Sequence, residues 1–480
     1  MFGKNLFFAY NNKQRERFHS ACFLNRGDFL GKYFGTDGFR GRAGVTLNCE
    51  HAYKIGRFLG WYLKNGTGQL RAVIGKDTRL SSYMLEYAIA SGLCASGADS
   101  YMLHVTTTPS VSYACISEGF DVGIMISASH NPYYDNGIKL FSSNGKKLSD
   151  DITLLIEKYI DGDFSLSDGK DIPLCEGSEI GRIFDHSYGR NRYIGYLISL
   201  AKRSFKGLRI GLDCANGSTF MIAKSVFDAL GAKSYAIGSE PDGLNINLGV
   251  GSTHIESLRS FVLENKLDMG FAFDGDGDRC ICVDHLGEVI NGDKIIYILA
   301  SQLKKANELF SDTVVVTVMS NLGLLLALDK LGIKYEKTKV GDKYVYESME
   351  KGGYSLGGEE SGHIILSKYA TTGDGILTSI MLCLCVLEEK TTLNALARDI
   401  TFFPQVIKSV NVKNKDEILN KKEVAEIINQ VENILDKSGR VLVRKSGTEP
   451  VIRIMIEAKS KKECEYFVSK ISEVIEKNDK

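Results

Sequence analysis

Residues 208–217 read LRIGLDCANG, an apolar run that ends in a polar turn. The same pattern occurs at 71–79, RAVIGKDTR, and at 313–321, TVVVTVMSN. Each run is typical of a buried β-strand. In each case a helix-like stretch follows and leads to a second apolar strand, at 96–103, 230–237 and 331–338. We interpret the chain as three degenerate copies of one supersecondary unit.

Each copy continues through a further helix to another apolar strand, which ends in a polar loop. These loops are ISASHNP (126–132), FDGDGDR (273–279) and GGEESGH (357–363). Alternation of strand and helix at this spacing predicts βαβ units on a mostly parallel sheet. Ligands of such sheets bind beyond the carboxyl ends of the strands. We therefore expect the three loops to face one cleft.

The predicted fold class is α/β, with three similar domains of mixed or parallel sheet and a smaller C-terminal α+β domain around a central cleft. The predicted segments are an N-terminal extension, 1–31, and four domains, 32–185, 186–295, 296–401 and 402–480. The extension has no strong periodicity and no cleavage site after a long apolar core, so we expect a disordered or weakly transit-like arm rather than a secretory signal. A translation start near Leu30 is a further hypothesis for it.

The composition excludes several classes of protein. With 44% hydrophobic and 25% charged residues, the chain is neither disordered, collagen-like nor a coiled coil. Its 59 basic residues balance 59 acidic ones, so we expect no nucleic acid and no membrane as partner. No apolar run approaches the roughly 18–20 residues that cross a bilayer. The 11 cysteines include no CxxC pair, and both CxC pairs lie in apolar stretches, which favours core burial over zinc and predicts a reducing cytoplasm.

The loop FDGDGDR carries the strongest chemical signal. Asp274, Asp276 and Asp278 alternate with glycines, so in an extended loop their carboxylates point the same way. Three hard oxygen ligands in one place suit Mg²⁺ or Ca²⁺. An EF-hand needs Gly at the sixth position and Glu at the twelfth, where this loop has Arg279 and His285. The EF-hand interpretation fails, and another type of metal site is favoured over a solvated acidic turn.

Ser129 is the candidate nucleophile. It follows an apolar strand and precedes His130 in the string SASHNP. The GxSxG elbow of hydrolases is absent, and adjacent Ser and His do not suit a hydrolase pair. A turn built from Ser, Asn and Pro is the alternative for this loop taken alone, but its place at a strand end, opposite the metal loop, favours a functional role. Asn136–Gly137 predicts a tight turn that presents Lys139 back towards Ser129, although a lone lysine is usually exposed.

Three more loops supply polar groups. GGEESGH places Glu359, Ser361 and His363 at period two, where they can hydrogen-bond sugar hydroxyls or an amine, unless the loop is a plain glycine-rich turn. RKSGTEP is balanced between a plain turn and a phosphate site, to which it offers Arg444, Ser446, Gly447 and Thr448. GTDGFRG (35–41) adds Arg40. Neither GxGxxG nor a Walker A string occurs, which disfavours dinucleotide and P-loop folds.

A metal loop, a serine loop, a polyol loop and an anion loop together describe phosphoryl transfer on a small phosphorylated sugar. From about Lys32 to the C-terminus the chain resembles the α-D-phosphohexomutase family, in the family's order and spacing. The strings that carry the resemblance are KYFGTDGFRG, ISASHNPYYDNGIK, PDGLNIN followed by GSTH, VGDKYV, GGEESGH followed by TTGDG, and RKSGTEPVIR. The chain is most similar to members that act on glucosamine phosphates. Three positions depart from that subgroup, in which Cys, Gln and Pro are usual: Val250, Glu360 and Lys445.

The resemblance implies a function for each loop. Ser129 would be carried as phosphoserine and would hold one Mg²⁺ together with Asp274, Asp276 and Asp278. Three carboxylates and a phosphate carry about −5 against +2 from the metal, which explains why basic side chains should converge there. The implied catalytic residues besides Ser129 are Arg40, His130 and Lys139. The implied substrate-binding residues are Arg279, Glu359, Ser361, His363, Arg444, Ser446, Gly447, Thr448 and Arg453.

The implied reaction interconverts glucosamine 6-phosphate and glucosamine 1-phosphate through a 1,6-bisphosphate, and this or a similar bisphosphate would be the activator. The product would feed UDP-N-acetylglucosamine and cell-wall synthesis. A phosphomannomutase or phosphoglucomutase of the same fold is the alternative enzyme. A regulator that binds metal and sugar phosphate without turnover would be expected to lack Ser129, Lys139 or one of the three aspartates, and all five are present. The expected partner is a small phosphorylated amino sugar. That the protein forms a homodimer is left as an open hypothesis.

Overall fold

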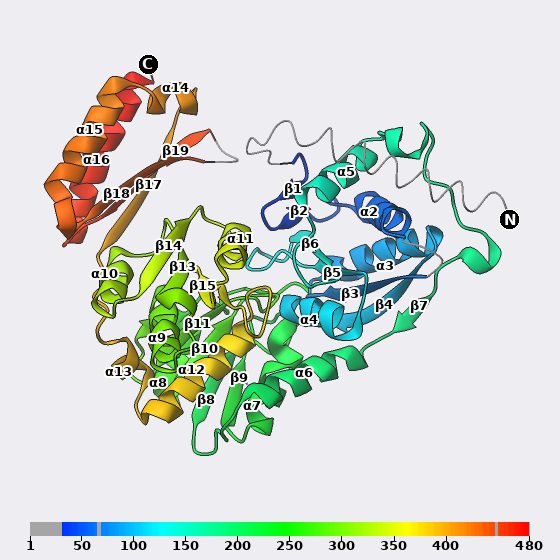
Figure 1. The fold of residues 1–480 in the computed structure, drawn as a ribbon, viewed down its shortest axis with the longest axis horizontal. Coiled ribbons are helices and arrows are strands. Elements are labelled where there is room, and N and C mark those ends of the chain that lie inside the picture. Colours follow the sequence, from blue (N-terminus) through cyan, green and yellow to red (C-terminus); the bar gives the residue numbers. More distant parts are fainter. Residues whose placement is uncertain (1–30, 65–68, 447–449, 480) are drawn as a thin grey trace. The chain divides into compact units, whose positions relative to one another are not determined.

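The protein is described by a computed structural model that covers residues 31–64, 69–446 and 450–479 (Figure 1). The predicted N-terminal extension therefore lies, apart from Gly31, outside the described residues. The chain divides into two compact units. The first holds the described residues up to Val318 together with Glu336–Ala397, and the second holds Met319–Tyr335 and the residues from Arg398 onward.

The first sheet of unit one has seven strands in the order β1-β2-β6-β5-β3-β4-β7. Strand β3 pairs in parallel with both β4 and β5, whereas β6 runs antiparallel to β5 and β2. The strands are β1 (Phe34–Gly35), β2 (Gly38–Arg42), β3 (Leu70–Lys76), β4 (Ala98–Val105), β5 (Val122–Ile126), β6 (Asp135–Ser142) and β7 (Ile183–Asp185).

The second sheet has five strands in the order β12-β11-β10-β8-β9. Strand β8 is parallel to β9 and β10, and β11 is antiparallel to β10. The strands are β8 (Arg209–Asp213), β9 (Lys233–Ile237), β10 (Met269–Phe273), β11 (Cys280–Asp284) and β12 (Val289–Ile290).

The third sheet has four strands in the order β14-β13-β15-β16. Strand β13 is parallel to β15, which is antiparallel to β16. The strands are β13 (Thr313–Thr317), β14 (Lys334–Thr338), β15 (Leu356–Gly358) and β16 (Ile364–Leu366).

The three sheets repeat one strand order. The first strand of each copy (β3, β8 or β13) lies between the second (β4, β9 or β14) and the third (β5, β10 or β15), and a returning strand (β6, β11 or β16) flanks the third. The three polar loops singled out from the sequence occupy the turn after the third strand in each copy. This agreement confirms the predicted α/β class with three similar domains of mixed sheet.

The helices follow the predicted alternation, and several begin at a side chain that accepts a backbone N–H. Asn48 caps α2, Thr107 caps α4, and Asp374 caps α12. The helices of the three repeats are α2 (Cys49–Tyr62), α3 (Leu80–Ala95), α4 (Thr108–Glu118), α5 (Asp150–Ile160), α6 (Tyr188–Leu200), α7 (Ala223–Ala229), α8 (Glu256–Glu264), α9 (Gly292–Lys305), α10 (Leu322–Lys330), α11 (Asp342–Gly352), α12 (Gly375–Glu389) and α13 (Leu393–Ala397). Short 3-10 turns lie at Ser165–Ser167, Gly177–Glu179, Ser218–Met221, Phe310–Asp312 and Asp436–Ser438.

The second unit contains the smaller α+β domain predicted at the C-terminus. Its antiparallel sheet has the order β17-β19-β18. A separate core of buried aliphatic side chains joins this sheet to its helices. The elements are β17 (Gln405–Asn411), β18 (Arg440–Lys445), β19 (Val451–Glu457), α14 (Lys415–Leu419), α15 (Lys422–Leu435) and α16 (Lys461–Asn478).

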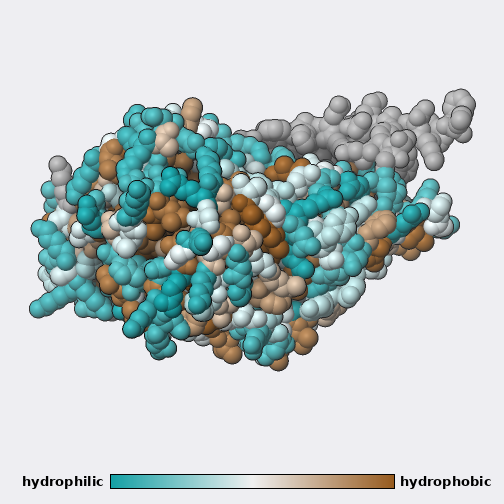
Figure 2. Space-filling view, turned by 90° about the horizontal axis from the view of Figure 1, so that it is seen from below, coloured by the Kyte–Doolittle hydropathy of each residue, from teal (hydrophilic) through white to brown (hydrophobic). Residues whose placement is uncertain are grey.

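Both CxC pairs are buried, as their apolar surroundings predicted. Cys280 and Cys282 alternate on β11, and Cys383 and Cys385 lie on α12. The surface drawn in Figure 2 is largely hydrophilic, with apolar side chains scattered between polar ones. Among the described helices, none combines the length and the apolar character that crossing a bilayer requires.

Candidate active site

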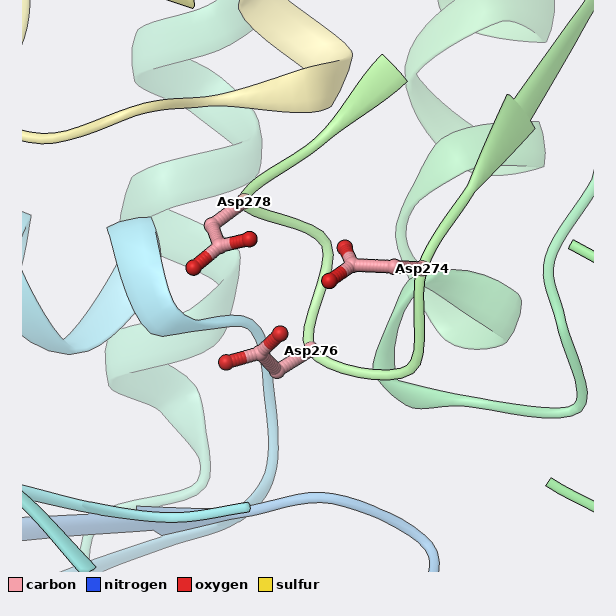
Figure 3. A group of neighbouring side chains, drawn as sticks. All are labelled: Asp274, Asp276 and Asp278. Atoms are coloured by element: carbon pink, nitrogen blue, oxygen red, sulfur yellow. The ribbon is translucent and has the colours of Figure 1, made fainter. Parts of the chain in front are cut away.

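The three aspartates predicted to bind a metal lie in the turn between β10 and β11 (Figure 3). Each offers one carboxylate oxygen, and these oxygens lie within 4.8 Å of one another. The convergence was predicted, but its cause was not an extended loop. The N–H of Gly277 donates to the carbonyl of Asp274 over 3.1 Å, and Gly277 has a φ of +73°. A tight turn therefore brings the carboxylates together.

The donor set fits a hard divalent cation. All three aspartates are buried, and Asp276 Oδ1 and Asp278 Oδ1 have no hydrogen-bond partner among the described residues. Burial and the neighbouring carboxylates of Asp278 and Asp276 raise the pKa of Asp274 well above its usual range. Buried, unsatisfied carboxylate oxygens of this kind are the ligands that Mg²⁺ prefers.

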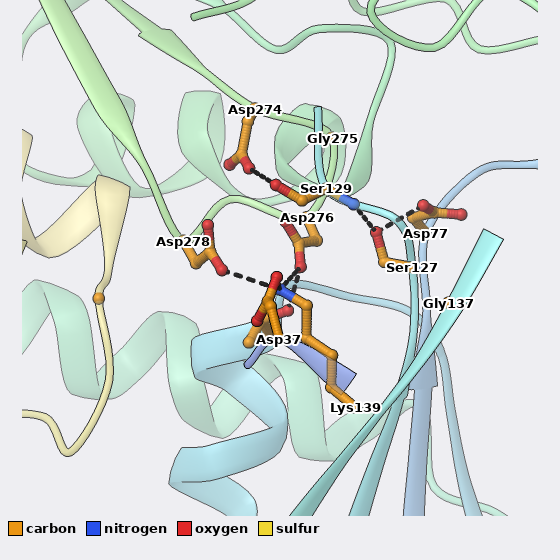
Figure 4. Close-up of polar contacts among 12 residues, drawn as sticks. Asp37, Asp77, Ser127, Ser129, Gly137, Lys139, Asp274, Gly275, Asp276 and Asp278 are labelled. Atoms are coloured by element: carbon orange, nitrogen blue, oxygen red, sulfur yellow. Dashed lines mark hydrogen bonds and ion pairs between the residues drawn. The ribbon is translucent and has the colours of Figure 1, made fainter. Parts of the chain in front are cut away.

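Ser129 lies directly against this cluster (Figure 4). Its Oγ atom donates a 2.5 Å hydrogen bond to Asp274 Oδ2, although the two residues are 145 positions apart. The residue is fully buried and has a φ of +54°, in the left-handed region. The serine loop of the first domain and the aspartate loop of the second thus meet, as predicted.

The prediction of a tight turn at Asn136–Gly137 is wrong, because both residues lie inside β6. The chain turns earlier, where the N–H of Asp135 donates to the carbonyl of Pro132. Glycine is required at 137 for close strand packing, since a Cβ atom there would lie 2.4 Å from the Ser127 carbonyl oxygen. Strand β6 nevertheless brings Lys139 into the site, where its amine contacts Asp276 and Asp278 of the aspartate loop.

Lys139 is the central cation of the cluster. Its buried Nζ atom lies 2.8 Å from Asp276 Oδ2, 3.0 Å from Asp278 Oδ2 and 3.2 Å from Asp37 Oδ2. Although burial disfavours the charged amine, these carboxylates raise its pKa well above the usual range. The pKa of Asp278 lies well below its usual range, because Lys139, His363 and Arg279 outweigh the effect of burial. The amine stays charged and neutralises part of the acidic cluster.

Arg40 is linked to the site by Asp37, an acidic residue that was not singled out from the sequence. It forms an ion pair with Asp37, and its Nη1 atom lies 3.4 Å from Asn131 Oδ1. Asp37 also contacts Lys139 and accepts a 2.8 Å hydrogen bond from Lys147 Nζ. Lys147 Nζ further lies 2.6 Å from Asp342 Oδ2, at the start of α11. Alternating charges thus link the serine loop to the third repeat.

His130 and Arg279 lie together beside Ser129. Arg279 Nη1 lies 3.2 Å from His130 Nδ1, and Ser129 Oγ lies 3.3 Å from the same nitrogen. Burial, together with Arg279 and Arg40, lowers the pKa of His130 to about 4. The ring is therefore neutral near pH 7, and Arg279 keeps its charge beside Asp278 and Asp274.

The sugar-loop residues are only partly brought together. Glu359 and His363 are buried, whereas Ser361 is exposed. The predicted alternation of these three side chains is absent, because the N–H of Gly362 donates to the carbonyl of Glu359 over 3.0 Å and closes a turn. Glu359 Oε1 accepts a 2.9 Å hydrogen bond from the N–H of Gly341.

His363 faces the aspartate cluster. Its Nδ1 atom lies 3.8 Å from Asp278 Oδ1, and its Nε2 atom accepts a 3.0 Å hydrogen bond from the N–H of Gly373. Burial opposes charging of the ring, but the carboxylates of Asp278, Asp342 and Glu359 raise its pKa. The third repeat therefore contributes a histidine to the cluster formed by the other two.

The predicted anion loop lies in the second unit. Arg444 on β18 is directly paired with Arg453 on β19, and burial and this neighbour lower the pKa of Arg444. The N–H of the buried Ser446 donates to the carbonyl of Val451 over 3.0 Å. Gly447 and Thr448 lie outside the described residues. Two guanidinium groups on adjacent strands suit a phosphate.

Several residues of the site were not singled out from the sequence: Asp37, Lys147 and Asp342, together with Arg79 and Asn247, which both donate hydrogen bonds to the carbonyl of Ser129. Asp37 lies in GTDGFRG, Asn247 in the stretch 241–254, and Asp342 in VGDKYV, so three of the five lie in strings that carried the family resemblance. The strings marked these segments, but no spacing rule distinguished these side chains from their neighbours.

Comparison with known proteins places the chain in a family. Four models described as phosphoglucomutase/phosphomannomutase match it: α/β/α domain I at residues 31–166, domain II at 191–287, domain III at 291–402 and the C-terminal domain at 408–474.

The chain is also similar to curated proteins and solved structures. It is 56% identical over 448 residues to a phosphoglucosamine mutase of Lachnospira eligens, covering 93% of this chain and 98% of that protein. The phosphoglucosamine mutase of Bacillus subtilis is 46% identical over 446 residues, again covering 93% and 98%. A phosphoglucomutase/phosphomannomutase family protein from Burkholderia thailandensis has the same fold, with a TM-score of 0.75, 22% identity and coverage of 93% and 98%. The chain belongs to the phosphoglucomutase/phosphomannomutase family.

Proposed function

We propose that the protein is an intramolecular phosphotransferase that interconverts glucosamine 6-phosphate and glucosamine 1-phosphate. The observation that carries the proposal is the buried hydrogen bond between Ser129 and Asp274, within a cluster of three carboxylates. Relatives that are 45–56% identical over about 93% of the chain are named phosphoglucosamine mutase, which supports the choice of sugar.

In the proposed cycle Ser129 begins as phosphoserine. The O1 hydroxyl of glucosamine 6-phosphate forms a bond to the phosphorus while the bond from phosphorus to Ser129 Oγ breaks, and the proton of O1 passes to Ser129 Oγ. The resulting 1,6-bisphosphate turns over in the site. Ser129 Oγ then bonds the phosphorus at C6 while the bond from phosphorus to O6 breaks, and the proton of Oγ passes to O6. Glucosamine 1-phosphate leaves, and the phosphoserine is regenerated.

The side chains of the cluster would act by position and charge. Lys139 and Arg279 offset the negative charge that spreads over the transferring group in a loose transition state. Arg40 and the neutral His130 would orient the group beside Ser129. Glu359 and His363, with the exposed Ser361, would contact the sugar. Arg444, Ser446, Gly447, Thr448 and Arg453 would bind the phosphate that does not react.

Mg²⁺ is the cofactor we propose, held by Asp274, Asp276, Asp278 and the phosphoserine. When bound, it would supply Lewis-acid neutralisation of phosphoryl oxygens. A sugar 1,6-bisphosphate would prime and reactivate the enzyme by phosphorylating Ser129. We further propose a cytoplasmic enzyme with the five segments predicted from the sequence, whose product supplies UDP-N-acetylglucosamine synthesis.

Coupled assays on one preparation test the choice of sugar. We expect the highest kcat/KM with glucosamine phosphates, because the relatives similar over the whole chain carry that name. Glucose and mannose phosphates are the matched comparison, since the family description includes enzymes for both. A higher kcat/KM with either of these would make the protein a phosphoglucomutase or phosphomannomutase instead.

A further inference from the structure

Ser129 has a backbone conformation that L-residues rarely adopt. Its φ of +54° places it in the left-handed region, where Cβ crowds the backbone. A non-glycine residue persists there only when its surroundings determine it. The contacts around the Ser129 peptide groups therefore bear on how its hydroxyl is aimed.

Arg79 binds the backbone carbonyls of the serine loop. The residue is fully buried, and its guanidinium makes five hydrogen bonds, the full number of N–H donors that arginine has. One goes to Asp77, and four go to the backbone carbonyls of Ser129, Asn131, Pro132 and Asp135. One buried side chain thus fixes the backbone on both sides of the turn.

Asn247 repeats part of this pattern from the second repeat. Its Nδ2 atom donates to the carbonyl of Ser129 over 2.9 Å and to that of Asn131 over 3.0 Å. Arg79 Nη2 contacts the same two carbonyls over 3.0 and 2.8 Å. Both carbonyls are therefore bridged twice, once from within the serine domain and once from the domain that carries the aspartates.

The N–H of Ser129 is fixed as well. It donates to Ser127 Oγ over 2.9 Å, and that hydroxyl donates to Asp77 Oδ2 over 2.7 Å (Figure 4). The aspartate loop packs directly against the Ser129 carbonyl, since a Cβ atom at Gly275 would lie 2.5 Å from its oxygen. Both polar groups of the Ser129 backbone are thus held in the orientation that points Oγ at Asp274.

We infer that Asn247 is a positioning residue for phosphoryl transfer: by bridging the carbonyls of Ser129 and Asn131, it locks the strained serine in register with the aspartate loop. The inference rests on the proposed function, because it assigns a purpose to the left-handed serine. It goes further in naming a side chain of the second repeat that contacts the backbone of Ser129 rather than its reacting hydroxyl. Preorganisation of this kind acts on the rate of the chemical step.

The test compares Asn247→Ala with Asn245→Ala, in which an asparagine of the same loop is removed. The side chain of Asn245 bonds within its own loop: it accepts from the N–H of Asp242 and donates to the carbonyl of Glu240. Each variant is dephosphorylated and mixed with glucosamine 1,6-bisphosphate, and phosphate on Ser129 is followed by intact mass. We expect Asn247→Ala to be phosphorylated about 10- to 100-fold more slowly than the control. KM for glucosamine 6-phosphate should change far less than kcat, and thermal unfolding should match the control.

Two further variants separate positioning from folding. Asn247→Asp keeps the size of the side chain but points an oxygen at two carbonyls, so it should be slower still. Ser127→Ala removes the acceptor of the Ser129 N–H. In the double variant with Asn247→Ala, the two effects on the phosphorylation rate should be less than additive. In the double variant with Asn245→Ala, they should be additive.

The outcomes distinguish the inference from the function on which it rests. If wild type and Asn245→Ala acquire phosphate and Asn247→Ala does so equally fast, the inference is overturned. If neither wild type nor control acquires phosphate on Ser129, the proposed function fails and the inference falls with it.

Discussion

The hydroxyl of Ser129 donates to Asp274 across 145 residues of sequence, and this 2.5 Å contact joins the two loops predicted to carry the chemistry. Since the hydroxyl is a side-chain group in an otherwise fixed loop, removing it should leave the fold intact. We expect Ser129→Ala to unfold at the wild-type temperature and to have no measurable turnover. Intact mass should show a phosphate adduct on wild type that the variant lacks, and near-wild-type activity in the variant would refute the phosphoserine mechanism.

The second prediction concerns the metal. Asp276→Asn removes one anionic ligand from the three, so activity should fall by orders of magnitude and require far more Mg²⁺. Calorimetric titration with Mg²⁺ measures the loss of affinity without relying on turnover. Asp329→Asn, at an exposed position on α10, is the control and should bind Mg²⁺ normally. Wild-type activity that survives EDTA would contradict a metal at this site.

The third prediction concerns Lys147, which contacts Asp37 and Asp342 within 2.6–2.8 Å. Lys147→Met keeps the length of the side chain but leaves both carboxylates without this cation. We expect kcat/KM to fall about 10- to 150-fold, the effect of losing a charge-assisted contact of roughly 1.5–3 kcal/mol. Much of the fall should appear in KM, because Asp342 adjoins Gly341, whose N–H holds Glu359.

The neighbouring lysine supplies a matched control. Lys146 pairs with Glu350 at a partly exposed position, and such pairs contribute about 0–1 kcal/mol. Lys146→Met should therefore change kcat/KM little. Equal losses in the two variants would show that general surface charge, rather than the Asp37–Lys147–Asp342 link, matters here.

These charged residues show where prediction from sequence ends. The strands β3, β8 and β13 were predictable because runs of apolar residues reflect local burial. Asp37 and Lys147 were not, because their pairing depends on contacts between segments 110 residues apart. The Asn136–Gly137 dipeptide is a local turn signal, but these residues form a strand because β6 pairs with β2 on one side and β5 on the other. The alternation predicted for Glu359, Ser361 and His363 is absent for a similar reason, because a turn replaces the extended backbone.

The fourth prediction concerns pH. Burial raises the pKa of Asp374 to about 6, despite hydrogen bonds from the N–H of Leu377 and the Tyr193 hydroxyl. The folded protein thus binds this proton more tightly than the unfolded chain, so stability should fall as pH rises from about 4 to about 6. Asp374→Asn should remove this contribution, which is up to about 3 kcal/mol, while still capping α12.

Denaturant unfolding of both proteins at pH 4.5 and 7 measures the difference. The variant should gain stability relative to wild type on going to pH 7. A pH-independent difference would show that Asp374 titrates near its ordinary pKa in the folded state.

The fifth prediction concerns the anion loop. If Arg444 grips the non-reacting phosphate, Arg444→Ala should lose about 10- to 150-fold in kcat/KM. Part of the loss should appear in kcat, because remote binding energy also orients the bisphosphate. The variant should keep its phosphoserine and Mg²⁺ requirement but need more added bisphosphate to stay active. Lys445→Ala, which removes an exposed pair with Asp416, is the control, and equal behaviour of the two variants would argue against a phosphate clamp.

The repeated strand order has a consequence for how activity is acquired during folding. Each sheet is built from strands close in sequence, so the three repeats can form independently and early. The bonds from Ser129 to Asp274 and from Lys139 to Asp278 span 145 and 139 residues, and they arise only when finished repeats dock. In refolding, far-ultraviolet circular dichroism should therefore recover before phosphorylation of Ser129. On the ribosome, the catalytic centre cannot form until Asp278 has emerged, long after the first sheet is complete.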